Sequence, residues 1–196
     1  MTETLHIDPR RTAVLCMDFQ VGIVQNSAGA DANGLLERTA ALLDAARAAK
    51  ARVGYVKVGF RPGYPEVSPN NLAFSTIRVS GRFEGDTPGG EIHARVAPRE
   101  GDFIVTKHRY GAFAGTDLDM ILRANGVDTL VLAGISTGGV VLSTVRHAAD
   151  ADYRIVIVAD CCADPDAEVH GVLMEKVFPR QAKVVNSAEV IAALRG

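Results

Sequence analysis

Short apolar runs alternate along the chain with longer stretches in which apolar residues recur at helical spacing. Unbroken apolar runs are typical of strands buried on both faces. The pattern predicts strands at residues 12–17, 53–58, 102–106, 129–133, 155–158 and 183–185. It predicts helices at residues 34–51, 70–77, 116–125, 139–151 and 166–178, and a last helix from residue 188. Strands that alternate with helices in this way predict a parallel sheet covered by helices on both faces.

Composition narrows the class of protein. The chain has 196 residues, of which 47% are hydrophobic, and it shows no internal repeat or linker, so we expect one domain over residues 1–196. Twenty-one basic and 23 acidic side chains leave a net charge of −2, which removes the electrostatic basis for binding nucleic acid or a membrane surface. No apolar run approaches the ~18 residues that span a bilayer, and no signal-peptide stretch begins the chain. We expect a soluble, cytoplasmic protein whose partner is a small molecule.

The carboxyl ends of the predicted strands hold the candidate chemistry, because ligands of parallel sheets bind there. Asp18 follows the first strand and Lys107 follows the third, and we expect their carboxylate and amine to lie within salt-bridge reach in one cleft, at the ends of adjacent strands. A lysine beside a carboxylate at a sheet edge is usually a structural ion pair. In a shielded cleft, however, Lys107 would keep Asp18 ionised and oriented, and Asp18 would move a proton to or from a substrate. The sequence leaves both interpretations open.

The glycine-rich turn after the fourth strand is a second candidate. Free amides at a helix start bind anions or oxyanions, which marks Gly138, Gly139 and Val140. The spacing is neither that of a dinucleotide-binding turn nor that of a P-loop. A tight turn without a function is the alternative.

Metal and thiol chemistry have little support in the sequence. The five histidines show no ligand spacing, so we expect no metal and no other cofactor. Only His108, which adjoins Lys107, is expected to approach a site. Cys16 lies two residues before Asp18, which puts both on one face of a strand. A thiol there is more typical of a small core residue than of a nucleophile. Cys161 and Cys162 are an adjacent pair that suits neither a disulfide framework nor a metal knuckle.

Several segments, in this order along nearly the whole chain, resemble the isochorismatase-like, or cysteine hydrolase, superfamily. These are residues 14–20 (VLCMDFQ), 101–107 (GDFIVTK), 111–118 (GAFAGTDL), 130–137 (LVLAGIST), Thr144 and 159–163 (ADCCA). The resemblance implies a six-stranded parallel sheet in an α/β/α sandwich. It also implies assembly as a homodimer or a larger homo-oligomer.

The resemblance also implies roles. In the amidase branch the catalytic residues are an aspartate, a lysine and a cysteine, which fall on Asp18, Lys107 and Val140. The family's non-proline cis peptide falls on Gly139–Val140. The Asp-x-His metal pattern of the nicotinamidases is missing. True isochorismatases also lack the cysteine and hydrolyse a vinyl ether with the aspartate as proton donor, but the histidine of their turn is missing here.

We therefore expect a hydrolase of a small polar metabolite that acts on a vinyl-ether or C–N bond without a cysteinyl intermediate. Asp18 is the expected acid/base, Lys107 its electrostatic partner, and the Gly138–Val140 backbone the anion-binding element. The candidate substrate contacts are Gln20, Arg61, His108, Arg109 and Phe113. A guanidinium of Arg61 or Arg109 would fork onto a substrate carboxylate, or would be a surface charge. The alternative function is a catalytically silent member that binds a small ligand or serves as an oligomeric scaffold.

Overall fold

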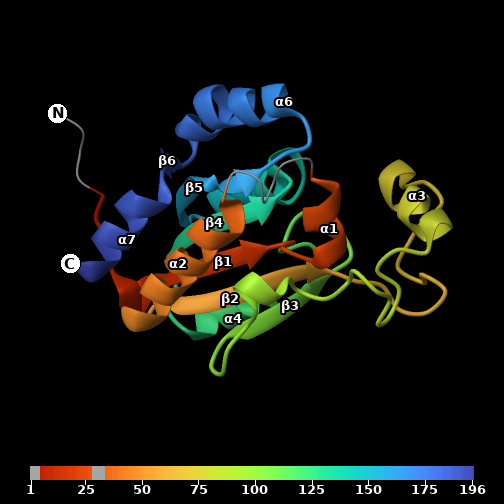
Figure 1. The fold of residues 1–196 in the computed structure, drawn as a ribbon, viewed down its shortest axis with the longest axis horizontal. Coiled ribbons are helices and arrows are strands. Elements are labelled where there is room, and N and C mark those ends of the chain that lie inside the picture. Colours follow the sequence, from red (N-terminus) through yellow and green to blue (C-terminus); the bar gives the residue numbers. More distant parts are fainter. Residues whose placement is uncertain (1–4, 28–33) are drawn as a thin grey trace.

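The structure, a computed structural model, describes residues 5–27 and 34–196. Within them, six strands form one parallel sheet in the order β3-β2-β1-β4-β5-β6 (Figure 1). The strands are β1 (Thr12–Met17), β2 (Arg52–Val58), β3 (Phe103–Lys107), β4 (Thr129–Ile135), β5 (Arg154–Ala163) and β6 (Lys183–Val185). All six were predicted, and β4 and β5 run further at their carboxyl ends than expected.

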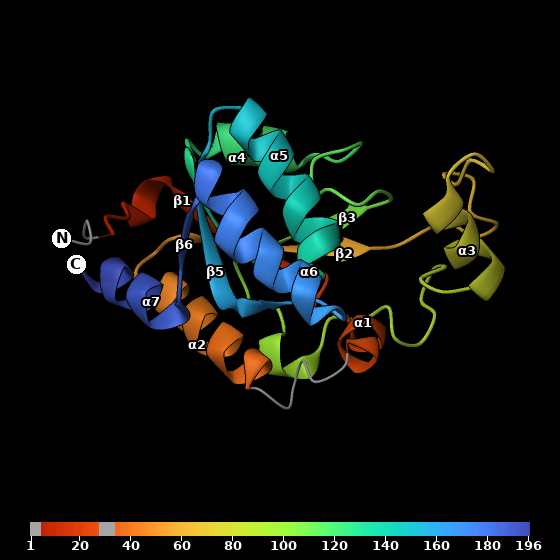
Figure 2. The same cartoon turned by 90° about the horizontal axis from the view of Figure 1, so that it is seen from above.

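Helices cover both faces of this sheet. They are α1 (Val21–Asn26), α2 (Leu35–Ala48), α3 (Leu72–Ser80), α4 (Leu118–Ala124), α5 (Leu142–Asp150), α6 (Ala167–Val172) and α7 (Ser187–Arg195). Figure 2 shows α4 and α5 on one side of the sheet and α2 and α7 on the other. The turns that follow α6 pack, through Leu173, Met174 and Phe178, into the same cluster as residues of α4 and α5. The predicted three-layer α/β/α sandwich is therefore confirmed. No helix of the described residues is long and apolar enough to cross a bilayer.

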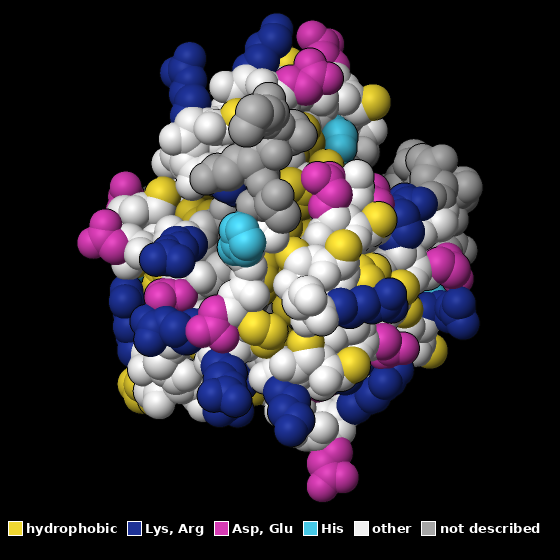
Figure 3. Space-filling view, turned by 90° about the vertical axis from the view of Figure 1, so that its left-hand side faces the viewer, with side chains coloured by type: hydrophobic (Ala, Val, Ile, Leu, Met, Phe, Trp, Pro, Cys, Tyr) yellow, Lys and Arg dark blue, Asp and Glu magenta, His cyan; other side chains and the backbone are white. Residues whose placement is uncertain are grey.

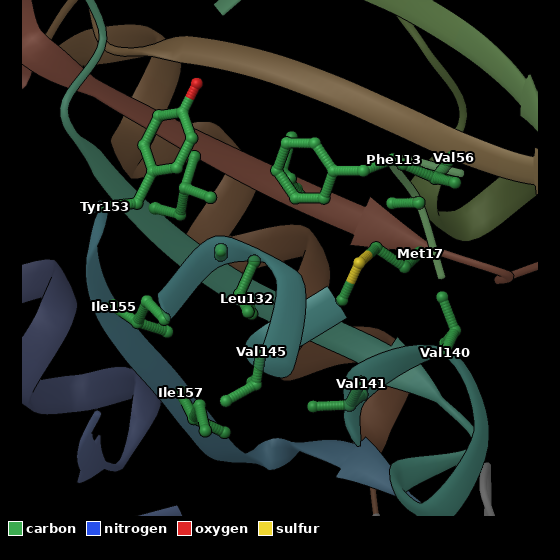
Figure 4. Packing of buried hydrophobic residues seen from close by; sticks show 14 of the residues in the cluster. Met17, Val56, Phe113, Leu132, Val140, Val141, Val145, Tyr153, Ile155 and Ile157 are labelled. Carbon is green, nitrogen blue, oxygen red and sulfur yellow. The ribbon is translucent and has the colours of Figure 1, made fainter. Parts of the chain in front are cut away.

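The central strand β1 shows why the sheet needs both helical layers. Every one of its residues is buried. Ala13, Leu15 and Met17 pack into the cluster beneath α4 and α5, part of which is drawn in Figure 4. Val14 and Cys16 point to the opposite side, into the cluster beneath α2 and α7. Alternate side chains of a strand point to opposite faces, so a wholly apolar strand needs cover on both.

Local differences from the predicted helices lie at helix ends. A π-helical turn, Thr137–Val141, precedes α5. A second one, Leu173–Val177, continues α6. The helix predicted over residues 116–125 begins later than expected, because the N-cap residue of α4 is Asp117. The Thr116 hydroxyl still accepts a hydrogen bond from the Leu118 amide, at 3.3 Å. The six-residue helix α1 was not predicted, because its apolar residues are too few to establish a helical period.

Residues 60–85 form a separate unit, which we call the arm. Its base is closed by two backbone hydrogen bonds, from the Phe60 amide to the Phe83 carbonyl (2.8 Å) and from the Gly85 amide to the Phe60 carbonyl (2.9 Å). Its helix α3 stands apart from the sheet in both ribbon views (Figures 1 and 2). A small apolar cluster connects the arm to the end of β2. It is made of Val58 of β2 and of Phe60, Tyr64, Val67, Phe74 and Phe83 of the arm.

Figure 3 views the end of the molecule opposite α3. Basic and acidic side chains are interspersed over that face. This fits a chain with 21 basic and 23 acidic residues.

Candidate active site

A cavity of about 260 Å³ lies at the carboxyl ends of β1 and β4. The strand order reverses between these two strands, since the chain runs outward to β2 and β3 on one side and to β5 and β6 on the other. Parallel sheets bind ligands at such a reversal, because the loops that leave the two strands separate there. The cavity walls come from the residues that follow β1, β3 and β4, and from the arm.

Asp18 and Lys107 meet in this cavity. Lys107 Nζ lies 2.9 Å from Asp18 Oδ2, and both side chains are buried, with 4% and 8% exposure. Lys107 Nζ also donates a hydrogen bond to the Arg109 carbonyl, at 3.0 Å. The predicted contact within salt-bridge reach is confirmed.

The prediction that the two residues end adjacent strands is wrong. Strand β2 lies between β1 and β3. Asp18 bends away from β1 with a φ of 59°, and its amide donates to the Val56 carbonyl of β2, at 2.8 Å. The carboxylate is thereby directed across β2, where the long side chain of Lys107 reaches it.

The Asp18 carboxyl is electrostatically suited to proton transfer. Burial raises its pKa, because a charged carboxylate loses its hydration, and the Lys107 ammonium opposes that rise. Its second oxygen, Oδ1, is buried and has no hydrogen-bond partner among the described residues. Buried polar atoms rarely lack a hydrogen-bond partner, so the unpaired state of this oxygen requires a physical explanation. A ligand in the cavity would supply the missing hydrogen bond.

The turn after β4 supplies another wall of the cavity, through Ile135, Ser136, Gly139 and Val140. Gly139 lies so close to Ser136 that a Cβ atom at residue 139 would be 2.7 Å from Ser136 Oγ, so a larger residue there would displace the Ser136 hydroxyl. The cis peptide bond is Ile135–Ser136, which corrects the expected position at Gly139–Val140.

Gly138 does not line the cavity, whereas Gly139 and Val140 do. Its amide donates a hydrogen bond to Asp164 Oδ2, at 2.7 Å. That amide is therefore occupied by the protein's own carboxylate, which corrects its expected part in binding an anion.

Val140 gives the cavity an apolar wall. Its side chain is 2% exposed, belongs to the same cluster as Met17 and lines the cavity (Figure 4). None of the three thiols lines the cavity. Burial raises the pKa of Cys16, and it raises the pKa of Cys161 to about 12.

The expectation that Cys16 shares a face with Asp18 is wrong. Cys16 packs beneath α2 and α7. Asp18 lies beyond the end of β1 with a positive φ, so the alternation of side chains in the strand no longer applies to it.

Two of the candidate substrate contacts are part of the protein's own framework. The Gln20 side chain is fully buried, donates to the carbonyls of Val58 (2.9 Å) and Gly90 (2.7 Å), and accepts from the Val58 amide (2.7 Å). Phe113 is buried in the core, where its ring stacks on His147 with centroids 4.5 Å apart. Both residues hold elements together and lie outside the cavity lining.

The other three candidates also lie outside the cavity lining. Arg61 is exposed and pairs with Glu66, at 2.5 Å. Arg109 donates to the backbone carbonyls of His108 (2.6 Å) and Glu66 (3.0 Å). His108 Nδ1 lies 2.5 Å from the Gly59 carbonyl oxygen, and its residue lines a separate hollow together with Arg61.

Sequence reasoning missed several residues that do line the cavity. These are Ser136 and Tyr110, which follow predicted strands, and Phe74, Ile77, Arg82 and Phe83 of the arm. Ser136 and Tyr110 lie within segments that the strand ends single out, so the sequence held a signal for them. The arm residues follow no strand of the sheet, so nothing in the pattern pointed to them.

The described residues contain no group of three or more His, Cys, Asp or Glu side chains arranged to hold a metal ion. The polar groups of the cavity are Asp18, Lys107, Arg82 and side-chain hydroxyl and amide groups. Such a set suits proton transfer and hydrogen bonding to a ligand.

Comparison with known proteins relates this fold and cavity to a family. A model of the isochorismatase domain matches residues 12–189. The uncharacterised isochorismatase family protein YwoC of Bacillus subtilis is 32% identical over 198 residues, which cover 100% of both chains. Ureidoacrylate amidohydrolase RutB of Agrobacterium fabrum is 34% identical over 178 residues, 81% of this chain and 78% of that protein. The crystal structure of a cysteine hydrolase from Pseudomonas syringae pv. phaseolicola has a TM-score of 0.87 at 26% identity, covering 100% of this chain and 99% of that one.

Proposed function

Because the chain belongs to the isochorismatase family of hydrolases, we propose that it hydrolyses a small metabolite by acid–base chemistry at Asp18, without a cysteinyl intermediate. One observation carries the proposal. Asp18 is buried against Lys107 at 2.9 Å, lines the cavity, and keeps one carboxyl oxygen without a partner among the described residues.

Asp18 would act at that second oxygen. In C–N hydrolysis, water adds to the substrate's carbonyl carbon while Asp18 accepts the proton of the water. Asp18 then returns that proton to the leaving nitrogen as the C–N bond breaks. In vinyl-ether hydrolysis, Asp18 gives its proton to the carbon of the double bond, and water adds to the oxocarbenium ion and returns a proton to Asp18. The hemiketal then breaks its ether C–O bond, and the leaving oxygen takes up that proton as an alcohol. Both reactions pass through the protonated form of Asp18, and the raised pKa of Asp18 stabilises that form.

Lys107 would act on Asp18 and not on the substrate. Its ammonium is held by both Asp18 and the Arg109 carbonyl, so it fixes the direction of the carboxyl group. It would also stabilise the ionised form whenever Asp18 has given up its proton.

Val140 would occupy the position of the nucleophilic cysteine of the amidases. The support is its place on the cavity wall beside Asp18 and Lys107. An isopropyl side chain forms no covalent bond to a substrate, so water must attack directly. The Gly139 amide donates to the Ser136 carbonyl at 3.2 Å, so the Val140 amide remains the proposed backbone group for binding an anion. The relative named as an amidohydrolase favours a C–N bond over a vinyl ether.

We further propose that residues 1–196 form one domain of this family. The family model covers residues 12–189 of it. Assembly as a homo-oligomer and a cytoplasmic location stay predictions.

A screen of small amides, ureido acids and vinyl ethers tests the proposed activity. We expect turnover that survives treatment with iodoacetamide, and that falls by about a hundredfold or more in Asp18→Asn, since general acid–base groups contribute about 10²–10⁴-fold. Inactivation by one equivalent of iodoacetamide, with the label on Cys16, would show that a thiol is the nucleophile. Stabilisation by ligands without turnover of any of them would identify a binding protein instead.

A further inference from the structure

The cavity is mainly apolar, although its floor carries the Asp18–Lys107 pair. Three aromatic rings and several branched aliphatic side chains make up most of its lining. The chief ones are Ile23, Phe74, Ile77, Phe83, Tyr110 and Val140. Apolar surface of this extent binds apolar groups by removing both surfaces from water. A wholly polar metabolite would leave this wall without a partner.

One further charged side chain lines the cavity, and it comes from the arm. Arg82 is exposed, and no carboxylate among the described residues pairs with it. Its guanidinium lies 4.8 Å from the centroid of the Phe83 ring, and its Nη2 donates to the Gly22 carbonyl at 3.3 Å. These contacts orient the guanidinium and leave most of its donors unused. Since Asp18 and Lys107 neutralise each other, the lining has a net charge of about +1 from Arg82.

We propose that the substrate is an amphipathic anion with an apolar body, whose anionic group binds Arg82. The apolar body would lie against the rings of Phe74 and Phe83. Placing the bond to be broken beside Asp18 rests on the function proposed above. The binding preference itself rests on the cavity alone, and a carboxylate is the anion that a guanidinium grips with two parallel hydrogen bonds.

Other cations of this region are less suited to the anion. Lys107 is already held by Asp18 and the Arg109 carbonyl. Arg61 pairs with Glu66 and does not line the cavity. Arg82 is therefore the specificity-determining cation, and the arm selects the substrate.

Calorimetric titration with three probes tests the inference without any turnover. The probes are 3-phenylpropanoate, its neutral analogue 3-phenylpropan-1-ol, and acetate. In the wild-type protein we expect 3-phenylpropanoate to bind about fivefold or more tightly than the alcohol, as for a partly exposed charge-assisted pair. We expect acetate to bind at least about tenfold more weakly than 3-phenylpropanoate, because it lacks the apolar body.

Three variants assign the preference to a residue. Arg82→Gln should bind the acid and the alcohol equally, and Arg82→Lys should keep part of the preference because it keeps the charge. Arg61→Gln, which alters an exposed arginine of the same arm, should behave as the wild type. Thermal unfolding of each variant checks that it is folded, and the lysine variant gives a second measurement of the charge effect.

Three results would overturn the inference. The first is an alcohol that binds as tightly as the acid, and the second is an acid preference that survives in Arg82→Gln. The third is acetate that binds as tightly as 3-phenylpropanoate. Because none of the probes is hydrolysed, failure here leaves the proposed hydrolysis untouched. Equally, a protein without turnover could still show the binding preference.

Discussion

The body of the molecule and its arm contribute to the same cavity but are built differently. In the body, Asp18 and Lys107 are fixed at the ends of β1 and β3, within a sheet that is covered on both faces. In the arm, the cavity-lining residues Phe74 and Phe83 belong to a small cluster separate from the two core clusters, which Val58 of β2 also joins. The body is thus suited to hold reacting groups in one geometry. The arm provides a surface whose side chains can be substituted without disturbing the sheet.

The exposure of apolar residues supports this contrast. The two most exposed large apolar side chains of the described residues are Leu72 (86%) and Val79 (89%), both on α3, whereas the most exposed one of the body, Met120, is 71% exposed. A helix that leaves large apolar side chains in water has few neighbours to stabilise it. Regions with few buried apolar contacts open locally at a lower free energy than the core does. We therefore expect the body to carry global stability, and the arm to open independently.

The largest expected effect comes from breaking the ion pair of the body. Asp18→Asn or Lys107→Met leaves one buried group without its partner, which costs about 3–5 kcal/mol of unfolding free energy. The double variant removes both charges, so it should lose clearly less than the sum of the two. Urea unfolding of the four proteins at pH 7 measures the coupling. Additive losses would mean that the two side chains do not stabilise each other.

Truncating one core residue in each region tests the comparison directly. Leu132→Ala should lower the unfolding free energy by about 2–5 kcal/mol, because it leaves a cavity in the body. Phe74→Ala should act mainly on the arm, so amides of residues 60–85 should exchange with solvent faster while those of the sheet do not. Hydrogen exchange with mass spectrometry distinguishes the two responses. An equal acceleration over the sheet in Phe74→Ala would show that body and arm unfold together.

The pH dependence of the unfolding free energy should reveal the burial of the Asp18 carboxyl. Burial raises the pKa of Asp18, so the folded protein holds that proton more tightly than the unfolded chain does. The contribution of Asp18 to the unfolding free energy should therefore fall as pH rises from about 3.9, the usual aspartate pKa, through the raised pKa of the folded state. The stability of the wild type minus that of Asp18→Asn isolates this slope. A difference that rises with pH would mean that Lys107 outweighs burial.

The smallest change in stability is expected for Val140→Cys, a near-isosteric substitution that should cost less than about 1.5 kcal/mol. The new thiol would face the cavity near Asp18, which can accept its proton. We expect one added alkyl group from iodoacetamide in the folded variant, measured by intact mass, and weak activity on simple amides.

The parent protein is the control for this variant. Its three buried thiols should stay unlabelled while folded and react in urea. Adding Asp18→Asn to Val140→Cys should slow the alkylation of the introduced thiol. Equal labelling with and without Asp18 would place residue 140 outside the reach of that carboxyl.

The order of strands and helices follows from the sequence, because each buried strand needs an unbroken apolar run and each covering helix needs an apolar stripe. The same logic singled out Asp18 and Lys107, since polar residues that end buried strands of a parallel sheet gather at one edge. Resemblance to the family added Val140 as the position of interest. These conclusions depend on local pattern and order along the chain.

Only the tertiary structure decided which side chains share the cavity. Gln20 and Phe113 fit the pattern of site residues. However, the Gln20 side chain is hydrogen-bonded to backbone groups, and the Phe113 ring packs in the core. Arg82 has no neighbour in sequence that suggests a site, yet the closure of the arm at Phe60 brings it to the cavity. Lys107 reaches Asp18 across β2 only because Asp18 leaves its strand with a positive φ. Hydrophobic periodicity reports the burial of each element, whereas a binding site depends on side-chain directions and loop paths that distant contacts set.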